Sequence, residues 1–233
     1  WFATGPVHGI QLQRGAPAGR LVIPCDHRFG SDGVDAGTFG AHVVYSDDHG
    51  ATWRLGAVAA TTATVAPNEN SCVELVAPAA GGGSRLHFNA RDHQGPFARA
   101  TTFSDDGGAS YSPAEFTDAP QFTCPTVQGA LVRFHATDRG DPANRILFSC
   151  PNGASRSRLS VWSSSDETAS WSAPKPVHEG PSAYSDMAVT GDGRVALIYE
   201  KGSSSPYETI PLAHFNEAWL DAPPPPAKTP APE

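Results

Sequence analysis

A short motif of serine, aspartate, glycine and an aromatic residue occurs three times in this chain, and it constrains the fold more than any other feature. Residues 46–53 read SDDHGATW, residues 104–111 read SDDGGASY and residues 164–171 read SSDETASW. The copies begin at residues 46, 104 and 164, so the repeat is about 60 residues long. A hairpin motif recurring at this interval is typical of a β-propeller with four-stranded blades.

The motif has a physical rationale as a tight turn. Its carboxylate can accept backbone N–H groups and close the turn, and its glycine (Gly50, Gly108) allows a positive φ without steric cost. Thr168 replaces the glycine in the third copy, which predicts a strained or altered turn. The aspartates are Asp48, Asp106 and Asp166. The aromatic residues, expected to anchor each hairpin in a small core, are Trp53, Tyr111 and Trp171.

The composition supports an all-β protein of many short strands. The chain has 233 residues, with 23 Gly and 22 Pro, and short apolar runs separated by turn-forming residues. No apolar run is long enough to span a membrane, so membrane contact is not indicated. At this spacing residues 1–220 hold about four blades of a larger, six-bladed ring. Residues 221–233, DAPPPPAKTPAPE, are expected to form an extended Pro-rich linker or tail.

Charge and cysteine content narrow the function classes. The formal net charge of −8 argues against a nucleic-acid binder but allows an anionic small substrate, because clustered arginines can reverse the local field. Cys25, Cys72, Cys124 and Cys150 form no C-x-x-C motif, so no zinc or redox site is indicated. One or two disulfides and buried free thiols both remain open.

Several segments between and after the repeats have a recognisable order. They are GPVHGIQL (5–12), NEN (68–70) with VEL (73–75), FNARD (88–92), SRSRLSV (155–161), AYSDM (183–187) and IYE (198–200). In content and order they resemble segments of the sialidases (neuraminidases), a glycoside hydrolase family whose propellers carry the repeat above as the Asp box. The resemblance extends from about residue 5 to residue 220.

The resemblance implies roles for five residues. Tyr184 is expected to be the nucleophile and Glu69 its general base. Arg91 and Arg156 are expected to bind the substrate carboxylate, and Glu200 to orient a further arginine. The implied activity is exo-α-sialidase: release of terminal sialic acid from glycoproteins or other sialylated glycans, with retention through a tyrosyl-enzyme intermediate. It needs no metal or cofactor, and its substrate implies an extracellular or lumenal location.

The chemistry explains why these residue types suit that substrate. Sialic acid carries a carboxylate on its anomeric carbon, which would repel a carboxylate nucleophile. A neutral phenol avoids this repulsion, but with a pKa near 10 it needs a base to remove its proton. Guanidinium groups suit the substrate because they pair bidentately with a carboxylate.

Other residues compete for these roles. Glu74 is a rival for the base, although it lies within the VEL run. Arg158, two residues after Arg156, is a rival for the role of carboxylate-binding arginine. The R-x-x-L spacing to Leu159 favours Arg156. Further polar residues could border a catalytic face, although a surface position or a turn would explain each of them: His8, Asp186, Tyr207 and Glu208.

Two elements of the family pattern are not found in this sequence. These are a first arginine in an R-I-P-type motif and an acid/base aspartate on a loop soon after it. The nearest string, VIPCDHR (22–28), lies after the GPVHG segment, and the chain starts at Trp1. The first two blades are therefore expected in another chain or in a portion removed or not included here. The alternative function is a catalytically inactive Asp-box propeller that binds glycans or serves as a structural module.

Overall fold

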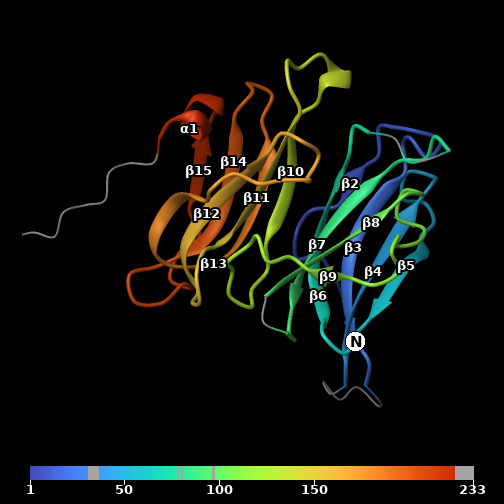
Figure 1. Ribbon diagram of the computed structural model, residues 1–233, viewed down its shortest axis with the longest axis horizontal. Coiled ribbons are helices and arrows are strands. Elements are labelled where there is room, and N and C mark those ends of the chain that lie inside the picture. The colour runs from blue at the N-terminus through green and yellow to red at the C-terminus, as the bar shows by residue number, and fades with distance from the viewer. Residues whose placement is uncertain (31–36, 78, 80, 96–97, 224–233) are drawn as a thin grey trace, which may run out of the picture.

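The computed structural model describes residues 1–30, 37–77, 79, 81–95 and 98–223, and its regular structure is almost entirely β-strand (Figure 1). No helix in these ranges is long and apolar enough to cross a membrane. Most of the expected Pro-rich tail, residues 224–233, lies outside the described residues. The elements are β1 (Phe2–Thr4), β2 (Ile10–Gln11), β3 (Leu21–Arg28), β4 (Phe39–Ser46), β5 (Arg54–Ala60), β6 (Pro67–Glu74), β7 (Leu86–Asp92), β8 (Arg99–Ser104), β9 (Thr117–Asp118), β10 (Ala130–His135), η1 (Thr137–Arg139), β11 (Arg145–Pro151), β12 (Ser157–Ser164), β13 (Lys175–Val189), β14 (Val195–Lys201), β15 (Leu212–Phe215) and α1 (Glu217–Asp221).

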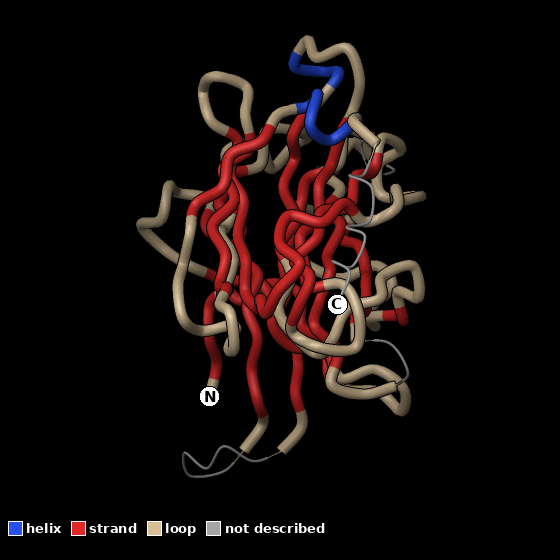
Figure 2. The backbone as a smooth tube through the Cα atoms, turned by 90° about the vertical axis from the view of Figure 1, so that its left-hand side faces the viewer, coloured by secondary structure: helices blue, strands red, loops and turns tan. Residues whose placement is uncertain are grey.

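The strands form three antiparallel sheets in chain order. The first has the order β1-β3-β4-β5 with β2 also on β3, the second is β6-β7-β8-β9, and the third runs from β10 to β15. The long strand β13 serves two parts of the third sheet, because its beginning pairs with β12 and its end with β14. The strand axes are roughly aligned with one another, and both short helical turns lie at the same end of the molecule (Figure 2). The all-β prediction is confirmed.

Three apolar cores hold this stack of sheets together. The first joins the facing sides of the first and second sheets around Val43 and Phe88. The second joins the second and third sheets around Val73 and Trp162. The third lies within the third sheet, where β10 to β12 pack against β14 and β15, with Leu197 fully buried. Each sheet therefore buries the apolar side chains of its alternating pattern against the next sheet, as stacked β repeats require.

The three sequence repeats form the same turn. In the first, Asp48 Oδ1 accepts the Thr52 N–H at 2.8 Å, and Ser46 Oγ accepts the Gly50 N–H at 2.8 Å. In the second, Asp106 and Ser104 make the equivalent bonds to Ser110 and Gly108. The serine and aspartate together pair the turn's backbone donors, which explains why these residue types recur.

The third copy keeps these hydrogen bonds despite its substitution. Asp166 Oδ1 accepts the Ser170 N–H at 2.9 Å, and Ser164 Oγ accepts the Thr168 N–H at 3.0 Å. Thr168 has φ 73°, close to the left-handed values of the glycines it replaces. A β-branched residue rarely takes this conformation, so the turn is strained, as expected, but its bonding is unaltered.

The aromatic residues of the three repeats differ in burial. Tyr111 is buried in the first core and Trp171 packs against the second. Trp53 is 45% exposed, so the prediction that it anchors a core is wrong. It lies just before β5, the last strand of the first sheet, and among the described residues no further strand follows β5 there to cover it.

The serine of the second repeat offers a test of the turn. Ser104 is fully buried and its Oγ accepts the Gly108 N–H, so Ser104→Ala leaves a buried donor unpaired. We expect the free energy of unfolding to fall by about 1–3 kcal/mol, measured by urea denaturation. Ser155→Ala, which removes an exposed hydroxyl bonded to Ser157, is the control and should change it by less than about 0.5 kcal/mol. Equal stability of both variants and the wild type would contradict this account.

Candidate active site

Tyr184 lies where the pairing of β13 is irregular. The register between β13 and β14 shifts between Ser182 and Ser185, so Tyr184 falls within the bulge. Its backbone N–H donates to Glu200 Oε2 at 3.0 Å, and its ring is half-buried. The bulge thereby turns the phenol out of the regular alternation of the strand.

The phenol meets two residues of the second sheet. Its hydroxyl donates to Glu69 Oε1, and Arg91 Nη1 lies 3.3 Å from the phenol oxygen. Arg91 Nη1 also donates to Glu69 Oε2 at 2.8 Å. The phenol, the carboxylate and the guanidinium thus form a closed triangle between residues up to 115 positions apart in the chain.

Glu69 also sits in a bulge, and its two neighbours hold that bulge. The register of β6 and β7 shifts between Pro67 and Asn70. The Asn68 amide donates to the Asp26 carboxylate at 2.8 Å, and the Asn70 amide donates to the Cys25 carbonyl at 2.7 Å. Both asparagines are buried, so the NEN segment is tied to β3 of the first sheet while Glu69 points at the phenol.

Arg156 lies over the ring of the tyrosine. Its guanidinium carbon is 5.7 Å from the centre of the Tyr184 ring, and its Nη1 donates to the Tyr207 hydroxyl. Arg158 has φ 58° and forms an ion pair with Glu179 at 3.4 Å, away from this group. The geometry therefore groups Arg156 rather than Arg158 with the tyrosine.

The surroundings of Tyr184 control its proton. Burial raises the pKa of the phenol well above its ordinary value, and the hydrogen bond and negative charge of Glu69 raise it further. The positive charges of Arg91 and Arg156 lower it in part. The phenol therefore stays protonated at rest, and Glu69 is placed to accept its proton.

The remaining candidates have other partners. Glu74 accepts backbone N–H groups of Gln13 and Arg14 and the hydroxyl of Ser84, which excludes it as the base for Tyr184. Glu208 caps the turn at residues 203–205 and is exposed.

His8 and Asp186 pair with each other. His8 Nδ1 is 2.7 Å from Asp186 Oδ1, and the His8 backbone N–H donates to Oδ2 of the same carboxylate at 3.1 Å. This pair joins the GPVHG loop to the strand that carries Tyr184.

Asp26 belongs to the site's surroundings, although it was not singled out from the sequence. It is 2% exposed, and burial raises its pKa to about 7, with a further contribution from the charge of Glu69. The sequence contained one sign of this residue's role, because Asp26 directly follows the apolar first five residues of β3. The partner, Asn68, is remote in sequence and could be paired with it only in the fold.

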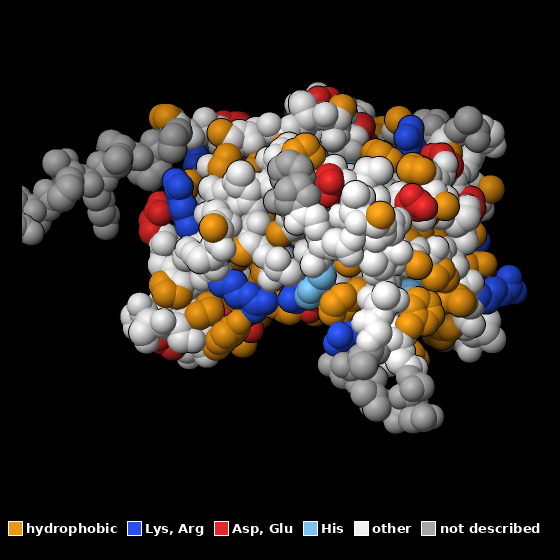
Figure 3. Space-filling view, turned by 60° about the horizontal axis from the view of Figure 1, so that its bottom comes forward, with side chains coloured by type: hydrophobic (Ala, Val, Ile, Leu, Met, Phe, Trp, Pro, Cys, Tyr) orange, Lys and Arg blue, Asp and Glu red, His pale blue; other side chains and the backbone are white. Residues whose placement is uncertain are grey.

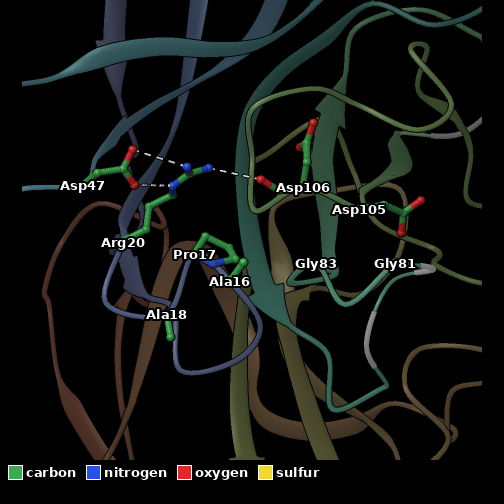
Figure 4. A pocket seen from close by; sticks show the side chains of 9 residues that line it. All are labelled: Ala16, Pro17, Ala18, Arg20, Asp47, Gly81, Gly83, Asp105 and Asp106. Carbon is green, nitrogen blue, oxygen red and sulfur yellow. Dashed lines mark hydrogen bonds and ion pairs between the residues drawn. The ribbon is translucent and has the colours of Figure 1, made fainter.

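Other features of the molecule are separate from this group. A surface pocket of about 670 Å³ lies between the Asp-box loops, where Arg20 pairs with Asp47 and donates to the Asp106 carbonyl (Figure 4). The four cysteines are free and buried, and burial raises the pKa of Cys25 to about 11. The described residues contain no group of three His, Cys, Asp or Glu side chains that could hold a metal ion.

Comparison with known proteins agrees with the repeat and with the fold. Residues 1–197 match the model of the BNR repeat-like domain. The chain belongs to this family. Its similar proteins include the sialidase of Micromonospora viridifaciens, 34% identical over 216 residues that cover 91% of this chain and 30% of that protein. Mouse sialidase-3 is 29% identical over 258 residues, covering 93% of this chain and 59% of that protein. The resemblance to sialidases is thus confirmed.

Solved structures show the same fold. The intramolecular trans-sialidase of Ruminococcus gnavus superposes with a TM-score of 0.68 at 23% identity, covering 96% of this chain and 46% of that chain. The leech intramolecular trans-sialidase gives a TM-score of 0.69 at 22% identity, covering 94% and 32%. This chain spans 30% and 28% of the length of the first two curated relatives that it matches.

Asp26 gives a test with a defined pH dependence. An unfolded aspartate ionises near pH 4 and the folded one near pH 7, so Asp26 lowers stability increasingly from pH 4 to 7 and by its full amount above pH 7. Asn at this position cannot ionise and still accepts from Asn68. We expect Asp26→Asn to melt at a higher temperature than the wild type at pH 8, with the difference vanishing near pH 4.

The control for this experiment is Asp47→Asn, which alters an aspartate in an exposed pair with Arg20. It should show no such gain at pH 8. Thermal unfolding followed by circular dichroism at several pH values measures both variants. A constant difference between Asp26→Asn and the wild type across the pH range would contradict the assignment.

Proposed function

We propose that this chain is the portion of an exo-α-sialidase propeller that carries the nucleophile, the base and two substrate-binding arginines. The observation that carries the proposal is the triangle of Tyr184, Glu69 and Arg91. A binding module would use the arginines, but it would not need a half-buried phenol hydrogen-bonded to a carboxylate. Two relatives of this chain are named sialidases, which supports the cleavage of sialic acid as the reaction class.

The proposed reaction has two displacements at the anomeric carbon. Glu69 takes the phenol proton as the Tyr184 oxygen bonds to that carbon, while the bond to the aglycone oxygen breaks and the leaving oxygen takes a proton from a general acid. Water then attacks the same carbon and gives its proton to the conjugate base of the general acid, while the tyrosine oxygen leaves and regains its proton from Glu69. Two inversions give net retention. A sugar hydroxyl in place of water would give transfer rather than hydrolysis.

The arginines hold the substrate in this proposal. Arg91 contacts the Tyr184 hydroxyl and the guanidinium of Arg156 lies over the Tyr184 ring, so both arginines can bind a substrate carboxylate close to the phenol. On the face shown in Figure 3, Lys and Arg side chains form a row beside a His and hydrophobic side chains, despite the net charge of −8. This local positive charge favours an anionic sugar.

Both ends of the stack of sheets present apolar faces that support a larger ring. On the first sheet, Leu55 and Val58 are 66% and 47% exposed and border a pocket of about 400 Å³. At the other end, Ile198 and Leu212 pair across β14 and β15 and are 47% and 60% exposed. We propose that further blades, in the same polypeptide or an associated one, cover these faces and supply the general acid and a third arginine beside Glu200. Such an enzyme would work on sialylated glycans outside the cell or in a lumenal compartment.

Substitution of the two central residues, in the protein that also carries the further blades proposed above, tests the proposal. Glu69→Gln keeps the shape of the side chain but removes the base, so we expect the kcat for a fluorogenic α-sialoside to fall about 10²–10⁴-fold. Tyr184→Phe should abolish turnover. Both variants should still bind a sialic-acid transition-state analogue, measured by calorimetry, because the arginines are intact. Turnover by Tyr184→Phe at the wild-type rate would show that the phenol is not the nucleophile, and analogue binding without turnover in the wild type would favour a glycan-binding module.

A further inference from the structure

One glutamine holds the backbone next to Tyr184. Gln128 lies two residues before β10 and is 1% exposed. Its Oε1 accepts the Ser185 N–H at 3.0 Å, and its Nε2 donates to the Ser185 carbonyl at 2.8 Å. A single side-chain amide therefore makes the pair of bonds that a neighbouring strand would make with this residue.

The strand needs such a partner at this point. β12 pairs with β13 only as far as Pro181. Beyond Pro181, the backbone groups on this edge of β13 need another hydrogen-bond partner. Ser185 is buried, and a buried backbone donor and acceptor without partners would cost several kilocalories per mole in principle. The Ser185 hydroxyl is also fixed, at 2.8 Å from the hydroxyl of Ser149 on β11. Ser185 is thus held through its N–H, its carbonyl and its side chain.

The consequence falls on Tyr184, the residue just before Ser185. Regular strand pairing does not fix the direction of the phenol, because Tyr184 lies in the bulge between Ser182 and Ser185. Ser185 is one end of that bulge, so fixing Ser185 fixes that end. Glu200 fixes the Tyr184 N–H at the same time. Gln128 shares a pocket of about 200 Å³ with Tyr184 and Glu200, but its amide is committed to Ser185.

We propose that Gln128 is a positioning residue for the tyrosine nucleophile, acting through the Ser185 backbone to aim the phenol at Glu69. This inference rests on the function proposed above. Displacing a reacting group by about 1 Å can cost about 10²-fold in rate, so loss of the amide should lower kcat and leave the binding of the substrate carboxylate nearly unchanged.

A glutamate at this position provides a selective test. In Gln128→Glu, the protonated acid can accept the Ser185 N–H and donate to the Ser185 carbonyl, whereas the ionised acid has no donor and repels that carbonyl. Burial and the nearby carboxylates of Asp186 and Glu200 raise the pKa of the introduced acid. Two arginines oppose them: Arg156, bonded to the Thr126 carbonyl, and the fully buried Arg99, bonded to the Val127 carbonyl.

The expected result is an added ionisation in the kcat profile of Gln128→Glu. Its kcat for the fluorogenic α-sialoside should approach the wild-type value at acid pH and fall about 10–100-fold below it as the introduced acid ionises. Gln128→Met, which has neither bond, should be lowered at every pH. The KM and the affinity for the transition-state analogue should stay within about threefold of the wild type. Gln11→Glu, which adds the same charge at an exposed amide, should follow the wild-type profile.

Amide hydrogen exchange of residues 183–187, measured by mass spectrometry, separates the possible failures. Faster exchange in Gln128→Met together with lowered kcat supports the proposal. A wild-type kcat profile in both Gln128 variants, while Tyr184→Phe is inactive, overturns the positioning role but leaves the proposed function. Absence of sialoside turnover in the wild type overturns both, and faster exchange would then show that Gln128 is only a structural clamp. If Gln128→Met does not fold, Gln128→Glu at acid pH still decides the question.

Discussion

The hydrogen bond from the Tyr184 hydroxyl to Glu69 is the interaction on which the rest of this site depends. Its two residues come from different sheets, and Arg91 bridges both. The triangle can exist only if the second and third sheets pack in one fixed relation, which the apolar core between them provides. The cores of the molecule thus do more than stabilise it, because they set the distance between the phenol and the carboxylate.

Both partners of that bond sit where regular sheet pairing breaks. A bulge presents each of them, and buried amides hold the two bulges: Asn68 and Asn70 on one side and Gln128 on the other. Irregular strand segments are expected at functional sites, since a bulge re-aims a side chain that the sheet would otherwise direct elsewhere. Fixing such segments with side-chain amides replaces the backbone bonds that the bulges give up.

The sequence predicted the parts of the structure that depend on local chemistry. The repeated turns could be foreseen because each aspartate bonds within its own motif. The site residues followed from the resemblance to sialidases, and the fold brings Tyr184, Glu69, Arg91 and Arg156 together. Asp26, Gln128 and the exposure of Trp53 could not be foreseen, because they depend on register and on contacts between sheets that no local pattern records.

The most direct test of this account is to trap the proposed tyrosyl intermediate. A 2,3-difluorosialic acid has fluoride as its leaving group, which depends far less on a general acid than a sugar alkoxide does, and its second fluorine slows hydrolysis of the product by destabilising the oxocarbenium-like transition state. We predict that the protein gains the mass of one 3-fluorosialosyl group and that peptide mapping places it on Tyr184, with no gain in Tyr184→Phe. Binding of the reagent without a covalent adduct, or an adduct on another residue, would contradict the central claim.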